Sequence, residues 1–74
     1  MRYRYEVRIG PEDVGKRVVV RWRRPAPGGG EEVADVVGPL EAAGEDGFAV
    51  RNRRGELVEI PRERALAARV VPPR

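Results

Sequence analysis

The sequence contains no cysteine, histidine, serine, threonine or glutamine, and it has a single asparagine among 74 residues. The missing cysteines exclude disulfide bonds and thiolate metal ligands. Without histidine, serine, threonine and cysteine, the chain also lacks the usual nucleophiles and the commonest general base. Adjacent acids such as Glu31-Glu32 and Glu45-Asp46 lack the spaced pattern of a calcium loop. We therefore expect no catalytic residue, metal site or cofactor in this chain.

Long hydrophobic runs and a signal peptide are also missing. No stretch reaches the ~20 apolar residues of a membrane-spanning helix. We therefore expect no membrane association and a cytoplasmic location, with which the absence of cysteine is compatible. The length, 74 residues, predicts one small domain. A domain of that size buries only about 60% of the surface that its unfolded chain exposes.

Charge is abundant: 15 basic and 12 acidic residues give a net charge of +3. All the bases except Lys16 are arginine, and alanine, glycine, proline and valine are frequent, as in proteins from genomes rich in G and C. The number of arginines is therefore weak support for nucleic-acid binding. Because acids are spread through the whole sequence, a mixed, solvated surface is the simpler interpretation.

The segment 16–24, KRVVVRWRR, predicts the central β-strand. Its side chains alternate between a core face and an outer face, with Val18, Val20 and Trp22 on the first and Val19, Arg21 and Arg23 on the second. Trp22 is the only tryptophan, so this strand carries the largest single hydrophobic surface available to a core. Glycine and proline at 25–30 end the strand in a surface loop.

Turn signals divide the rest of the chain into further short strands. The alternation at 2–9 predicts a half-buried antiparallel strand, followed by a turn at 10–13. Residues 31–43 fit helical spacing in part, but an internal proline costs a helix about 3 kcal/mol. We therefore expect a strand at 33–42, with a kink or bulge and an edge position at Gly38-Pro39.

Two glycine turns, at 44–47 and 53–56, separate strands at 48–52 and 57–60. Pro61 is well placed to begin one short helical turn at 62–65. A last strand follows at 69–71. The predicted core consists of Val7, Val18, Val20, Trp22, Val36, Leu40, Phe48, Val50, Val58, Ile60, Leu66 and Val70.

This pattern predicts an all-β domain, a small five- or six-stranded Src-homology-3-like barrel with one short helical turn before the last strand. A barrel is favoured because so short a chain cannot fill two sheets, and closure removes sheet edges.

Three motifs resemble one actinobacterial group: VGKRVVVR at 14–21, DVVGPLEA at 35–42 and VRNRRGELVEIPRERALAARVVPP at 50–73. The group is the N-terminal Src-homology-3-like domain of GNAT-type N-acetyltransferases. The resemblance implies a non-catalytic accessory domain, with an acetyltransferase domain and its acetyl-CoA downstream in the same polypeptide. Residues 1–13 fall outside the pattern and are expected to add a strand and a turn, and 72–74 are expected to begin a linker. No catalytic or cofactor-binding residue carries over.

A second hypothesis is nucleic-acid binding by outward-facing arginines on adjoining strands, which would form one basic stripe: Arg21, Arg23, Arg51 and Arg53. Tyr3 and Tyr5 could stack on bases. The competing interpretation is a solvated outer face on which Glu41 and Glu59 act as counter-charges. Proline-rich peptide recognition has only fold analogy in its favour.

Overall fold

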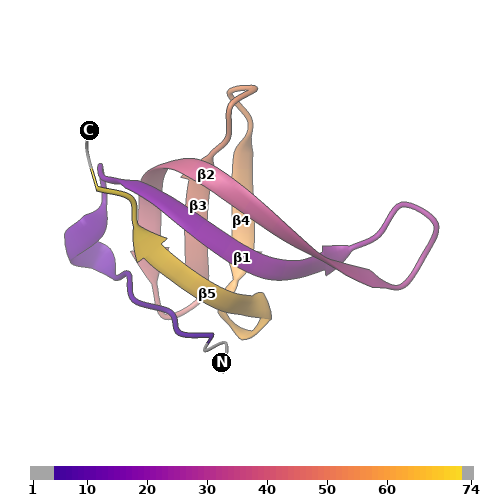
Figure 1. The fold of residues 1–74 in the computed structure, drawn as a ribbon. Coiled ribbons are helices and arrows are strands. Elements are labelled where there is room, and N and C mark those ends of the chain that lie inside the picture. Colours follow the sequence, from indigo (N-terminus) through magenta and orange to yellow (C-terminus); the bar gives the residue numbers. More distant parts are fainter. Residues whose placement is uncertain (1–4, 73–74) are drawn as a thin grey trace.

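The structure, a computed structural model, describes residues 5–72 and is all-β. Its five strands form one antiparallel sheet in the order β4-β3-β2-β1-β5 (Figure 1). The elements in chain order are η1 (Pro11–Asp13), β1 (Arg17–Pro25), β2 (Glu31–Gly44), β3 (Gly47–Arg51), β4 (Leu57–Pro61), η2 (Arg62–Arg64) and β5 (Ala65–Val70). The all-β class and the helical turn before the last strand are therefore confirmed. Within residues 5–72, no helix is long and apolar enough to cross a membrane.

The long strand β2 bends and takes part in two ladders. Residues 31–39 pair with β1, and the ladder with β3 begins at Leu40, which lies opposite Val50. Pro39 is the last residue in the ladder with β1, so the proline lies where the strand changes partner. A register shift between Leu40 and Ala42 follows directly, close to the predicted kink. The predicted edge position is wrong, because β2 is the middle strand of the sheet.

The N-terminal segment does not form the predicted antiparallel strand within residues 5–10. Val7 makes one parallel bridge with Ala68 of β5. Ala68 donates its N–H to the Glu6 carbonyl at 2.9 Å, and Arg8 donates to the Ala68 carbonyl at 2.8 Å. Residues 2–4 of the prediction lie outside the described part. The predicted buried face is confirmed only toward its end: Ile9 is 7% exposed, whereas Tyr5 is 52% exposed. An extended segment has two faces with or without a full ladder, so its pattern could not specify the pairing.

The turn at 10–13 is confirmed and forms η1. The Asp13 carboxylate accepts hydrogen bonds from the Gly10 N–H and the Lys16 ammonium, each at 3.0 Å. These contacts, with the Lys16 hydrogen bond as the largest cause, lower the pKa of Asp13. Asp13 thereby connects Gly10, at the end of the N-terminal segment, to Lys16, the residue before β1.

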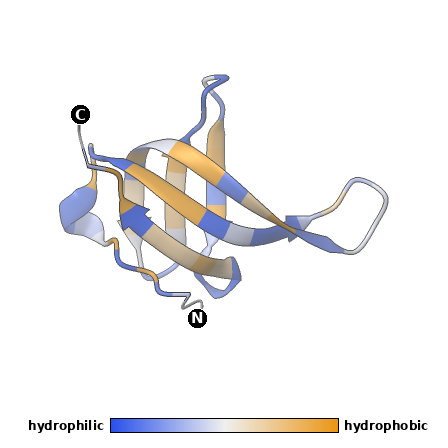
Figure 2. Cartoon of the chain, viewed as in Figure 1, coloured by the Kyte–Doolittle hydropathy of each residue, from blue (hydrophilic) through white to orange (hydrophobic). Residues whose placement is uncertain are grey.

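The core contains seven of the twelve predicted residues as buried side chains: Val18, Val20, Val36, Leu40, Phe48, Val50 and Ile60. Ile9, Ala49 and Ala68 are also buried. Four predicted residues pack against this cluster while partly exposed: Val7, Trp22, Val58 and Val70. Leu66 is partly exposed as well. Figure 2 shows the hydrophobic residues gathered along the central strands, with hydrophilic residues in several turns and at single positions along the strands.

Trp22 is less buried than its size predicts. The ladder between β1 and β5 ends at the Trp22–Ala65 pair, beyond which β1 and β2 continue as a two-stranded ribbon. The ribbon is visible to the right of the sheet in Figure 1. The indole therefore lies at the end of the core, where it lines an open hollow of about 440 Å³.

Two glycines allow close backbone approaches. A Cβ on Gly38 would lie 1.8 Å from the Arg51 carbonyl oxygen, where β3 passes the bend of β2. A Cβ on Gly47 would lie 2.0 Å from the Ile60 oxygen, and this glycine also has a φ of +146°. Side chains are excluded at both positions because the neighbouring atoms belong to backbone.

We expect Gly38→Ala to destabilise the domain by about 1–3 kcal/mol, as overpacking in a dense interior does. The matched control is Gly44→Ala on the same strand, where a Cβ would meet nothing within 4 Å. That change should stay within about 0.5 kcal/mol. Urea denaturation of both variants measures the two effects. Equal stabilities would show that β3 does not approach β2 this closely.

Candidate functional site

The four arginines of the predicted basic stripe do not lie on adjoining strands. Arg21 and Arg23 are on β1, Arg51 ends β3, and Arg53 lies in the turn before β4. Because β2 separates β1 from β3, the predicted arrangement is wrong. Nucleic-acid binding itself stays a prediction.

Arg21 is neutralised by Asp35, its cross-strand partner on β2. Its guanidinium donates from Nε to Oδ1 at 2.8 Å and from Nη2 to Oδ2 at 3.0 Å. This paired geometry is the strong form of an arginine–carboxylate contact. The hydrogen bonds from Arg21 lower the pKa of Asp35, and partial burial opposes them.

Arg51 is neutralised in the same way by Glu41. Its Nε and Nη2 donate to the two carboxylate oxygens at 2.7 and 2.9 Å. The pair lowers the pKa of Glu41 and raises that of Arg51, mainly through these hydrogen bonds. Glu41 is therefore the counter-charge that the sequence suggested. Glu59, by contrast, makes no ion pair within residues 5–72.

Arg23 and Arg53 make no ion pair with any residue between 5 and 72. Arg53 projects from a turn that the single asparagine organises. The Asn52 side-chain oxygen accepts the N–H groups of Arg54 and Glu56, each at 2.9 Å. Gly55 has a φ of +82°, as the predicted hairpin turn requires. Of the four predicted arginines, therefore, only Arg23 and Arg53 have no ion pair within residues 5–72, and they lie on separate elements.

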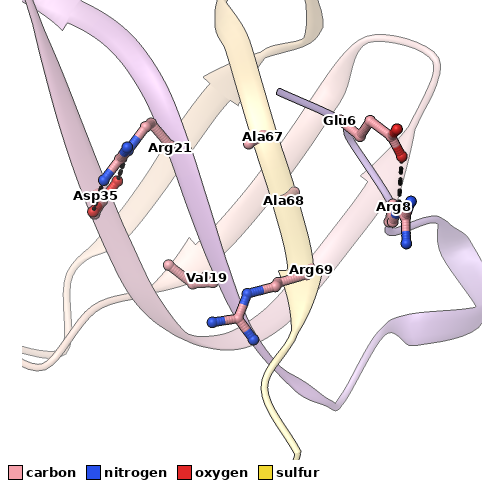
Figure 3. A pocket seen from close by; sticks show the side chains of 8 residues that line it. All are labelled: Glu6, Arg8, Val19, Arg21, Asp35, Ala67, Ala68 and Arg69. Carbon is pink, nitrogen blue, oxygen red and sulfur yellow. Dashed lines mark hydrogen bonds and ion pairs between the residues drawn. The ribbon is translucent and has the colours of Figure 1, made fainter. Parts of the chain in front are cut away.

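A hollow of about 520 Å³ lies on the outer face of β1 and β5, beside the N-terminal segment. Figure 3 shows Arg21 turned toward Asp35, Arg8 turned toward Glu6, and Arg69 beside Val19. The Arg8–Glu6 contact is 2.6 Å, and its hydrogen bond raises the pKa of Arg8. The hollow therefore contains three guanidinium groups and two carboxylates, both of which are already engaged.

A larger hollow of about 1,090 Å³ continues along the same outer face. We call it the valine surface, defined by Val19, Val37 and Val71 with Arg17 and Arg69 at its rim. Val19 and Val37 are direct cross-strand partners, and Val37 is 39% exposed. No acidic residue lines it within the described chain.

Val19 was expected on the outer face of its strand, but the valine surface was not predicted. The signal was present in the pair Val36-Val37, since one of two successive strand residues must face away from the core. With Val36 in the core, Val37 had to be outside. The sequence did not reveal the register between β1 and β2, which places Val37 opposite Val19.

We expect Arg21→Gln to raise the pKa of Asp35 toward its ordinary value of about 3.9. In the wild-type chain this carboxylate adds stability above its unfolded-state pKa, and the contribution disappears as the pH falls through the lowered folded-state pKa. The variant should therefore be less stable than the wild type near neutral pH, with a difference that shrinks in acid.

Carboxyl NMR titration combined with urea unfolding at several pH values measures both effects. Arg23→Gln is the control, because Arg23 has no ion pair in the described part of the chain. An unchanged Asp35 titration in the Arg21→Gln variant would contradict the assigned contact.

Comparison with known proteins gives one family. The family model described as "Rv0428c N-terminal Sm-like domain" matches residues 12–69, which contain all five strands except the last residue of β5. No curated protein and no solved structure matches the chain. The match confirms the coarser expectation of a small domain of β-barrel type and leaves most of the N-terminal segment outside the family, as the motifs suggested. The chain belongs to the Rv0428c N-terminal Sm-like domain family.

Proposed function

We propose that this chain is a non-catalytic accessory domain of an N-acetyltransferase whose catalytic domain follows it in the same polypeptide. The observation that carries the proposal is the family match, because its description places the domain at the N-terminus of the protein it names. The motifs at 14–21, 35–42 and 50–73 support the finer assignment to GNAT-type enzymes by resemblance. The strand order and the η2 turn before β5 support the Src-homology-3-like layout.

The composition fits an accessory role. Acetyl transfer from acetyl-CoA to an amine needs a group that takes the amine proton and donors that stabilise the developing oxyanion. This sequence has no histidine, serine, threonine or cysteine to serve there. Its described carboxylates at 13, 35 and 41 have lowered pKa values, the opposite of what a general base near neutral pH requires. Acetyl-CoA would therefore be held by the following domain.

Nucleic-acid binding through Arg21, Arg23, Arg51 and Arg53 is the weaker proposal. Phosphates would have to compete with the carboxylates of Asp35 and Glu41 for two of the four guanidinium groups. The remaining two lie on separate elements, β1 and the β3–β4 turn. No structural observation favours this binding over a solvated surface.

We expect removal of residues 1–74 from the full-length protein to lower its Tm by at least about 2–4 °C, which corresponds to about 1 kcal/mol for a domain of 150–250 residues. If the accessory domain stabilised its enzyme by less than this amount, the change in Tm would be too small to detect. Thermal unfolding and acetyl-CoA turnover of both forms provide the measurement.

Two results would contradict the proposal. One is a natural protein whose intact mass ends near the 8.3 kDa of this chain. The other is a longer protein whose turnover and thermal stability are both unchanged by the deletion.

A further inference from the structure

We propose that the valine surface is the face on which this domain docks against the following domain, and that it receives an aliphatic side chain flanked by carboxylates. The inference rests on the proposed function, because it names the contact between the two domains. Three properties of the surface support it: its apolar floor, its basic rim and its position beside the end of β5.

The floor of the valine surface is apolar, although its residues are not needed to fill the core. Val18, Val20 and Val36 fill the inner face of β1 and β2 and are at most 7% exposed. Val19 and Val37 face each other on the opposite side, where strands usually carry polar residues. A single exposed valine needs no explanation. A facing pair in a hollow of about 1,090 Å³, with Val71 and Pro72 beside it, provides an apolar surface that a partner could cover.

The rim carries three cations, of which Lys16 is paired with Asp13 at 3.0 Å while the two arginines are not balanced by the described chain. Arg17 and Arg69 make no ion pair within residues 5–72. Of the nine other arginines among residues 5–72, four likewise have no ion pair there, and five contact a carboxylate: Arg8, Arg21, Arg24, Arg51 and Arg64. Free cations around an apolar floor are complementary to a partner that presents acids around an apolar side chain.

The position of the surface selects the following domain as the occupant. Val71 donates its N–H to the Arg17 carbonyl at 2.8 Å, which brings the residues after β5 alongside the beginning of β1. Pro72 itself lines the hollow. A domain connected through this segment is held at a high effective concentration beside the surface. A second copy of the chain is disfavoured, because a symmetric contact would place the two basic rims against each other.

The absence of cysteine from the chain allows a direct test by thiol labelling. Val37→Cys places a thiol on the floor of the valine surface. Val33→Cys is the matched control, since Val33 lies on the outer face of the same strand, is 55% exposed and is not part of the hollow. Each variant is made in the 74-residue chain and in the full-length protein, and alkylation at each site is followed by peptide mass spectrometry.

We expect the thiol at position 37 to react at least about tenfold more slowly in the full-length protein than in the 74-residue chain, which requires a docked population of about 90% or more. The thiol at position 33 should react equally in both. Reversing the charge with Arg17→Glu in the full-length Val37→Cys protein should restore fast labelling.

Equal labelling rates at position 37 in the two lengths would overturn the docking face while leaving the accessory role intact. Protection at position 33 alone would also overturn it, by placing the contact on the ribbon. A natural protein without an acetyltransferase domain would instead refute the proposed function, and the two failures are thus distinguishable.

Discussion

The passage of β2 from one ladder to the other is the constraint on which the rest of the structure depends. Residues 31–39 of this strand pair with β1, and residues from Leu40 onward pair with β3. Gly38 permits the close approach of the Arg51 carbonyl at the bend. Leu40, which is 1% exposed, donates its N–H to the Lys16 carbonyl at 2.9 Å while facing Val50 of β3. One residue therefore connects the two ladders, and a single core forms between them.

The same geometry determines what the domain displays. Since strand residues alternate, each core residue of β1 and β2 has an outward neighbour. Arg21 and Asp35 form one cross-strand pair on that outer face, and Val19 and Val37 form the next. The charges of the first pair neutralise each other. The second pair provides an apolar floor beside Arg17 and Arg69, which make no ion pair within residues 5–72. This difference between the neighbouring pairs is the basis of the proposed docking face.

Local patterns predicted the elements well because alternation and turn chemistry are local. The strands β1 to β4 and the η2 turn were expected near their observed positions, and Gly55 has the positive φ its hairpin needed. The last strand was predicted too short, because β5 begins at Ala65 and not at Arg69. Patterns could not predict neighbours. Pro39 suggested a sheet edge but lies where the middle strand changes partner, and the 2–9 segment gives one parallel bridge within its described part. The outward direction of Arg21 and Arg51 was predictable, yet their carboxylate partners depend on long-range contacts. Trp22 was expected in the core for its size, but its place at the end of the ladder leaves it partly exposed.

Native-state hydrogen exchange tests most directly whether β2 joins the two ladders into one cooperative unit. The amide of Leu40 and the core amides of β1 and β3, such as those of Val20 and Val50, should then open with the same free energy. That free energy should equal the global free energy of unfolding measured with denaturant. If the β3 and β4 amides instead opened with a markedly lower free energy than those of β1, the two ladders would be independent, and β2 would not have the role assigned to it.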